Sequence, residues 1–126
     1  MNRNRIARPA ILLTVLALGF ASAGGAEQLV ISVGGSSSAD GDLTFLFKPE
    51  QDEEQWISVS ILKGTNAKNS AREIRKEFVL ALSENYEVVL FGKEKKNVRI
   101  TSQSMAGAFD LELTNNTVGG LAISIE

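Results

Sequence analysis

The sequence predicts an α+β fold of about seven short, mostly antiparallel strands with one amphipathic helix packed on the sheet. Three observations lead to this expectation. Short segments of alternating apolar and polar residues recur along the chain, separated by Gly, Asn, Ser or Pro. Only one segment, about residues 70–84, places apolar residues at helical spacing. Most connections between strands are short, which favours antiparallel hairpins over crossovers.

The first three strands are predicted at residues 29–33, 43–47 and 56–62, where apolar side chains occupy every second position. A loop of small residues, 34–42, separates the first two strands. An acidic connection, 50–55, leads into the third strand. These strands should therefore each turn one apolar face toward a common core.

The helix is predicted from a capping box, in which the Ser70 hydroxyl and the Glu73 carboxylate satisfy backbone N–H groups at the helix start. Five apolar residues then recur along one face: Ala71, Ile74, Phe78, Ala81 and Leu82. Phe78 lies in the middle of this face and is expected to be buried against the sheet. Asn85 is expected to end the helix.

Four further strands are predicted at residues 87–91, 98–101, 109–113 and 121–125. The first of these is apolar on both faces, which is typical of a central strand covered from both sides. The strand–helix–strand order over residues 56–91 also allows a right-handed crossover between parallel strands. One helix covers only one face of a sheet, so the other face is either solvated or covered by the remaining strands.

Residues 1–26 have the features of an export signal. Three arginines precede an apolar segment, Ile11–Phe20, and small residues allow cleavage after Ala23 or Ala26. The apolar run of Ala10–Ala23 is shorter than the about 20 residues that a membrane-spanning helix needs. The sequence therefore predicts a cleaved signal peptide, a periplasmic or secreted location, no stable membrane insertion after cleavage, and a single α+β domain over residues 27–126.

Composition excludes several classes of function. Without residues 1–26 the chain has 10 Lys and Arg against 15 Asp and Glu, which argues against binding to nucleic acid or to anionic membranes. The chain has no His and no Cys, so Ser-His-Asp and Cys-His catalysis and imidazole metal ligation are excluded. We therefore expect a small exported, non-catalytic binding or structural module of the cell envelope or extracellular space, with a protein partner or self-association.

Two alternatives use carboxylates. Asp40 and Asp42 lie in the small-residue loop and offer oxygen ligands for calcium, although the residues after Asp40 do not follow the EF-hand spacing. A solvated turn explains the same residues. A small secreted enzyme or inhibitor would use carboxylates such as Asp40, Asp42 or Glu54. No other cofactor is indicated.

The candidate interaction residues are the apolar residues of the last strand, Leu121, Ile123 and Ile125. This strand has neither proline nor lysine, the residues that commonly protect a sheet edge, so it is suited to pairing with a partner strand. Alternatively, it lies inside the sheet with neighbours on both sides. Trp56 and Tyr86 are amphipathic aromatics at strand starts that suit either a partner contact or ordinary packing.

A small basic patch is expected where Lys93, Lys95 and Lys96 precede Arg99. It is a candidate binding surface. The sequence favours the alternative, in which these cations protect a hairpin tip from unwanted strand pairing.

Residues 57–107 also show a recurring pattern of apolar and small residues. It comprises Ile57, Val59, Ile61, Gly64, Thr65, Ala67, Ala71, Ile74, Leu82, Val88, Asn97, Val98, Ile100, Thr101, Ser102 and Gly107. This pattern resembles the strand–helix–strand–strand modules of bacterial surface, virion-tail and flagellar hook-associated (IN motif) proteins. The Ile-Asn pair of that motif is absent at the predicted helix end, Ser83–Asn85. The resemblance implies a structural or interaction module without catalytic residues.

Overall fold

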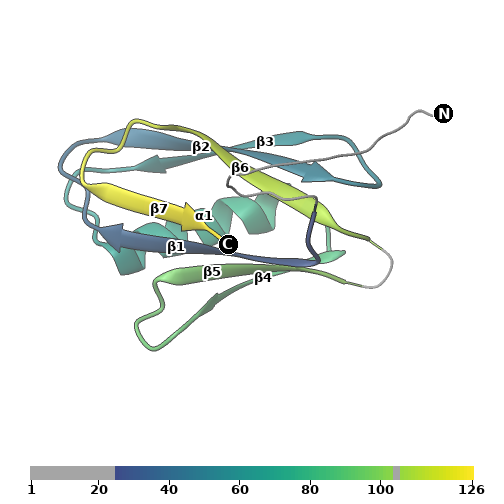
Figure 1. Cartoon of the computed structure of the whole chain (residues 1–126). Helices are drawn as coiled ribbons and strands as arrows, with labels where there is room; N and C mark the ends of the chain where they lie inside the picture. The colour runs from purple at the N-terminus through teal and green to yellow at the C-terminus, as the bar shows by residue number, and fades with distance from the viewer. Residues whose placement is uncertain (1–24, 104–105) are drawn as a thin grey trace.

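The computed structural model describes residues 25–103 and 106–126, which form two antiparallel β-sheets facing each other with one helix along one side (Figure 1). The predicted α+β fold, with seven strands and one packed helix, is confirmed. The predicted signal peptide lies outside the described residues, except for Gly25 and Ala26.

The elements follow one another along the chain in the predicted order. They are β1 (Gln28–Gly35), β2 (Gly41–Pro49), β3 (Gln55–Ile61), α1 (Ala67–Ala81), β4 (Tyr86–Phe91), β5 (Asn97–Ser102), β6 (Phe109–Asn116) and β7 (Leu121–Ile125). One sheet has the strand order β4-β5-β1-β7 and the other the order β3-β2-β6. Every strand pair is antiparallel.

The core lies between the two sheets, because alternate residues of each strand point inward. In β2 the inward residues are Leu43, Phe45 and Phe47, all buried, and in β1 they are Ile31 and Val33. The second sheet thus covers much of the apolar face that a single helix could not cover. The helix and the second sheet therefore cover the same face of the four-stranded sheet, and the residues on its opposite face are exposed or partly exposed, as in the solvated alternative.

The helix begins and ends about one turn earlier than the predicted 70–84. It spans Ala67–Ala81, and its N-cap is Asn66, whose side-chain oxygen accepts a hydrogen bond of 2.8 Å from the Asn69 N–H. The predicted cap, Ser70, is instead fully buried within the helix, and its hydroxyl has no partner among the described residues. None of the described residues belongs to a helix long and apolar enough to cross a membrane.

The prediction of a central strand at residues 87–91 is wrong, because β4 is an edge strand whose one partner among the described strands is β5. Val88 is the one residue of this strand that is buried, and it keeps 7% of its surface exposed. On the outer face, Phe91 is covered by the Arg99 guanidinium, 5.1 Å from the ring centre, and not by a second layer. The apolar outer face of β4, from which the sequence predicts a second covering layer, is thus partly covered by the side chain of Arg99.

The alternative of a parallel crossover between β3 and β4 is also wrong. The two strands belong to different sheets, so they do not pair at all. Helix α1 contacts both β3 and β4 and closes the open side between the sheets. The crossover rule applies to strands of one sheet and so has no bearing on this connection.

Candidate binding surfaces

The structure does not bring the three candidate carboxylates together. The Asp40 carboxylate accepts a hydrogen bond of 2.7 Å from the Lys63 N–H, and the Asp42 carboxylate accepts one of 2.9 Å from the Ser60 hydroxyl. Glu54 lies at the opposite end of the β2–β3 hairpin, about six strand residues or about 20 Å away. Within residues 25–103 and 106–126, no three acidic side chains are grouped so that they could hold a metal ion.

The two candidate aromatics have different environments. Tyr86 is half-buried, and its ring packs edge-to-face on Phe47 and Phe109 with ring centres 5.0 and 5.7 Å away. Trp56 lies on the outer face of β3 and is 63% exposed. Tyr86 therefore packs against the core, while Trp56 is accessible at the surface.

The packing of Tyr86 predicts that its phenol ionises at a higher pH than an exposed tyrosine does. Burial raises the pKa of the Tyr86 phenol above its usual value of 10.0, and the nearby Asp52 carboxylate adds to the rise. Tyr86 is the only tyrosine in the chain, so an ultraviolet titration reports this group alone. We expect a midpoint above 10 that falls in the Asp52→Asn variant. The pKa of Tyr86 is higher in the folded than in the unfolded protein. Its contribution to folding stability is therefore complete below pH 10 and is lost as the pH rises through the folded pKa.

A titration midpoint at or below 10 in the folded protein would contradict this packing of the phenol. Unfolding the same sample in denaturant gives the control, since the midpoint should then return to the usual tyrosine value.

Within residues 25–103 and 106–126, the last strand, β7, lies at the edge of the four-stranded sheet and pairs with β1 alone. Glu126 and Val30 exchange two backbone hydrogen bonds, of 2.8 and 3.0 Å. In an antiparallel ladder such pairs alternate with pairs whose backbone groups point to the other side. The N–H and C=O groups of Ile123 and Ile125 therefore point away from β1, toward the open edge.

This edge is unprotected over most of its length. Within the described part of the chain, no hydrogen bond engages the outward backbone groups of Ile123 or Ile125. The Asn116 side chain donates to the Leu121 C=O at 3.4 Å and so covers only the start of the strand. Of the two predicted alternatives, the edge strand is the one that the structure shows.

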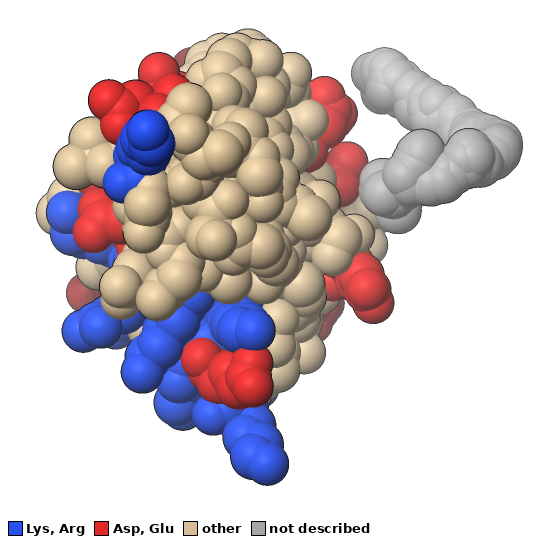
Figure 2. All heavy atoms as spheres, turned by 90° about the vertical axis from the view of Figure 1, so that its left-hand side faces the viewer, with Lys and Arg blue, Asp and Glu red and all other residues tan. Residues whose placement is uncertain are grey.

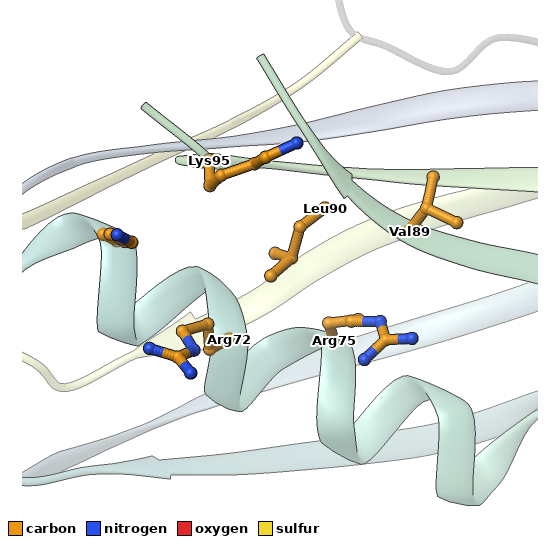
Figure 3. A pocket seen from close by; sticks show the side chains of 6 residues that line it. Arg72, Arg75, Val89, Leu90 and Lys95 are labelled. Atoms are coloured by element: carbon orange, nitrogen blue, oxygen red, sulfur yellow. The ribbon is translucent and has the colours of Figure 1, made fainter. Parts of the chain in front are cut away.

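A second candidate surface is a basic cleft between α1 and β4, with a volume of about 480 Å³. Four cations line it: Lys68, Arg72 and Arg75 from α1, and Lys95 from the β4–β5 turn. In Figure 3, Leu90 points from β4 toward the helix that carries Arg72 and Arg75, and Val89 completes the lining.

The charges of the chain are separated along the sequence and in space. Residues 67–102 have eight Lys and Arg against five Asp and Glu, whereas the other described residues have two against ten. Figure 2 shows the basic side chains gathered at the end where the β4–β5 hairpin turns. The predicted patch of Lys93, Lys95, Lys96 and Arg99 is thus part of a larger basic surface.

The sequence analysis identified the cations near the β4–β5 turn but not the helical wall of this cleft. The signal was present in the spacing of Lys68, Arg72 and Arg75 at positions i, i+4 and i+7, which places them on one side of a helix. The spacing does not reveal the opposite wall, because β4 meets α1 only in the folded chain.

No protein-family model matches the chain, and no curated protein matches it. The resemblance of residues 57–107 to hook-associated and virion-tail modules therefore stays a prediction.

Proposed function

We propose that this protein is a small exported, non-catalytic interaction module of the cell envelope or extracellular space that associates through the free edge of β7. The observation that carries the proposal is the row of outward backbone groups at Ile123 and Ile125, which have no hydrogen-bond partner among the residues that the structure describes. Exposed strand edges of this kind recruit further strands, and natural proteins commonly protect them with lysine or proline. Residues 121–125 contain neither.

The partner that fits this edge is a second copy of the chain. Two antiparallel β7 strands centred on Ile123 place Leu121 opposite Ile125 on one face and Ala122 opposite Ser124 on the other. None of these residues is charged, so the pairing has no charge repulsion within the strand. A twofold dimer of this type makes the two four-stranded sheets continuous.

The test compares Ile123→Pro with Ile123→Ala in the mature protein. Proline removes the outward N–H of Ile123 and leaves the hydrogen bonds between β7 and β1 in place, because that N–H points to the open edge. Both variants lose the isoleucine side chain, so alanine is the matched control. We expect sedimentation equilibrium to show a dimer for the wild type, a weakened dimer for Ile123→Ala and a monomer for Ile123→Pro.

Equal association of the proline and alanine variants would contradict strand pairing at β7. A wild-type protein that stays monomeric at millimolar concentration would contradict the second copy as the partner. Circular dichroism of each variant checks that the fold is retained.

Export is the other part of the proposal, supported by the basic and apolar pattern of residues 1–26. Of the two predicted cleavage positions, we propose the one after Ala23, which is supported by the backbone contacts of Ala26. The Ala26 N–H and C=O form hydrogen bonds of 2.9 and 2.8 Å with Phe109, so cleavage after Ala26 would remove this pair from the mature chain. We expect the intact mass of the native protein to show a chain that starts at Gly24. A full-length species in the membrane fraction would contradict cleavage.

A further inference from the structure

We propose that the basic cleft between α1 and β4 binds an acidic peptide segment in an extended conformation. The cleft lies at the edge of the four-stranded sheet opposite to β7, so this inference does not depend on the pairing proposed for β7. Three features of the cleft support it. They are a row of cations on α1, available backbone groups at the edge of β4, and similar repeat distances along the helix and along an extended peptide.

The cations of the helical wall form a row. Lys68, Arg72 and Arg75 are four and three residues apart, which at 1.5 Å per residue places them over about 10.5 Å along one side of α1. A single phosphate or sulfate is too small to contact the whole row. The row suits a ligand with several negative charges spaced along its length.

These cations have no acidic partners within residues 25–103 and 106–126. The ion pairs of the described chain involve other lysines: Lys48 with Asp110 and Glu112, Lys76 with Glu73, and Lys96 with Glu94. The Arg75 Nε donates to the Val88 C=O at 3.2 Å, which holds its guanidinium against β4. The remaining N–H groups of this guanidinium are available to a carboxylate.

The opposite wall of the cleft is the edge of β4, where Arg75 engages the Val88 C=O and the backbone groups of Leu90 are still available. Because the Val88 C=O points to α1, the alternation of the ladder also turns the N–H and C=O of Leu90 away from β5 and toward the cleft. No hydrogen bond engages these two groups of Leu90 in the described part of the chain. Unpaired backbone donors and acceptors at a strand edge are matched by the backbone of an extended peptide.

The spacing of the cations along the helix agrees with the spacing of side chains along an extended peptide. Side chains on one face of a strand lie about 6.8 Å apart, at two residues of about 3.4 Å each. Lys68 and Arg72 are about 6 Å apart along the helix. A peptide with Asp or Glu at alternate positions can therefore add to the edge of β4 while its carboxylates face the cations of α1. The apolar side chains of Val89 and Leu90 lie beside it.

The distribution of charge on the rest of the chain also favours an acidic partner. The elements outside residues 67–102 are strongly acidic, so the basic cleft is the part of the molecule that attracts a negative peptide. Steering of this type weakens as the salt concentration rises.

The test uses a capped pentapeptide of alternating glutamate and valine, with a glutamine-for-glutamate peptide as its uncharged control. Amide shifts of the ¹⁵N-labelled mature protein locate binding, and calorimetry gives the affinity at low and high salt. We expect the Leu90 amide to shift with the glutamate peptide only, and the affinity to fall with salt. Arg72→Gln should weaken binding about tenfold, the loss of one charged hydrogen-bond partner.

Lys76→Gln is the matched control, because it removes one positive charge from the exposed side of the same helix, outside the cleft. It should change the affinity less than about twofold, as expected for a screened charge near the surface. Equal losses in Arg72→Gln and Lys76→Gln would overturn the proposal, as would equal binding of the two peptides or shifts that leave Leu90 unaffected. Absence of binding by the glutamate peptide at millimolar concentration, or its displacement by equimolar inorganic phosphate, would overturn it as well.

Discussion

Phe78→Ala should lower the free energy of unfolding by about 3–5 kcal/mol, the cost of replacing a buried phenylalanine with alanine. Phe78 is fully buried on the inner side of α1. Its ring packs edge-to-face on Phe45, with ring centres 5.2 Å apart. Phe45 belongs to β2, so this contact ties the only helix of the described chain to the three-stranded sheet. The chain has no cysteine, so no disulfide compensates for the loss.

Chemical denaturation of the wild type and two variants measures this effect. Leu80→Ala is the control, because Leu80 lies on the same helix two residues away and is 75% exposed. Its loss should stay within about 0.5 kcal/mol, as is usual for surface substitutions. If Phe78→Ala and Leu80→Ala have similar effects, then α1 does not pack with this face toward the sheets.

The seven strands were predictable from the sequence, because the period of two that marks a half-buried strand is set by local geometry. The residue at which the helix starts was less predictable. Asn66 and Ser70 are both good N-cap residues, and the capping box at Ser70 and Glu73 is the stronger pattern. The chain uses Asn66 because Ala67, Ser70 and Ala71 are all buried in the fold. Small residues of this kind give a weak hydrophobic signal even where they pack closely.

The position of β4 and the basic cleft could not be predicted, because both depend on which strands pair. Residues 87–91 have the composition of an interior strand, yet the strand order places them at an edge. Arg72 and Lys95 are separated by more than 20 residues and line one cleft only because α1 closes the side of the sandwich next to β4. Long-range pairing of this type leaves no local trace in the sequence.

Gly35→Ala should destabilise the protein by about 2–5 kcal/mol, the sum of two contributions. Gly35 has φ of +78°, a conformation that costs an alanine about 1–2 kcal/mol. A Cβ at this position would also lie far inside van der Waals contact of the Gly120 carbonyl oxygen, which is backbone and cannot swing aside. Overpacking of this kind typically adds about 1–3 kcal/mol.

Gly64→Ala separates the two contributions. Gly64 has a similar φ of +87°, but no atom of the described residues lies within 4 Å of the Cβ that alanine would add. Denaturation should therefore show a loss of about 1–2 kcal/mol for Gly64→Ala, the cost of the backbone conformation alone. The additional loss in Gly35→Ala measures the contact between the end of β1 and the turn before β7. Since Gly35 pairs with Leu121 at the start of β7, this contact also fixes where the free edge of β7 begins. Equal losses in the two variants would show that β7 can move away from β1 at little cost, and the edge would then not be held in place for pairing.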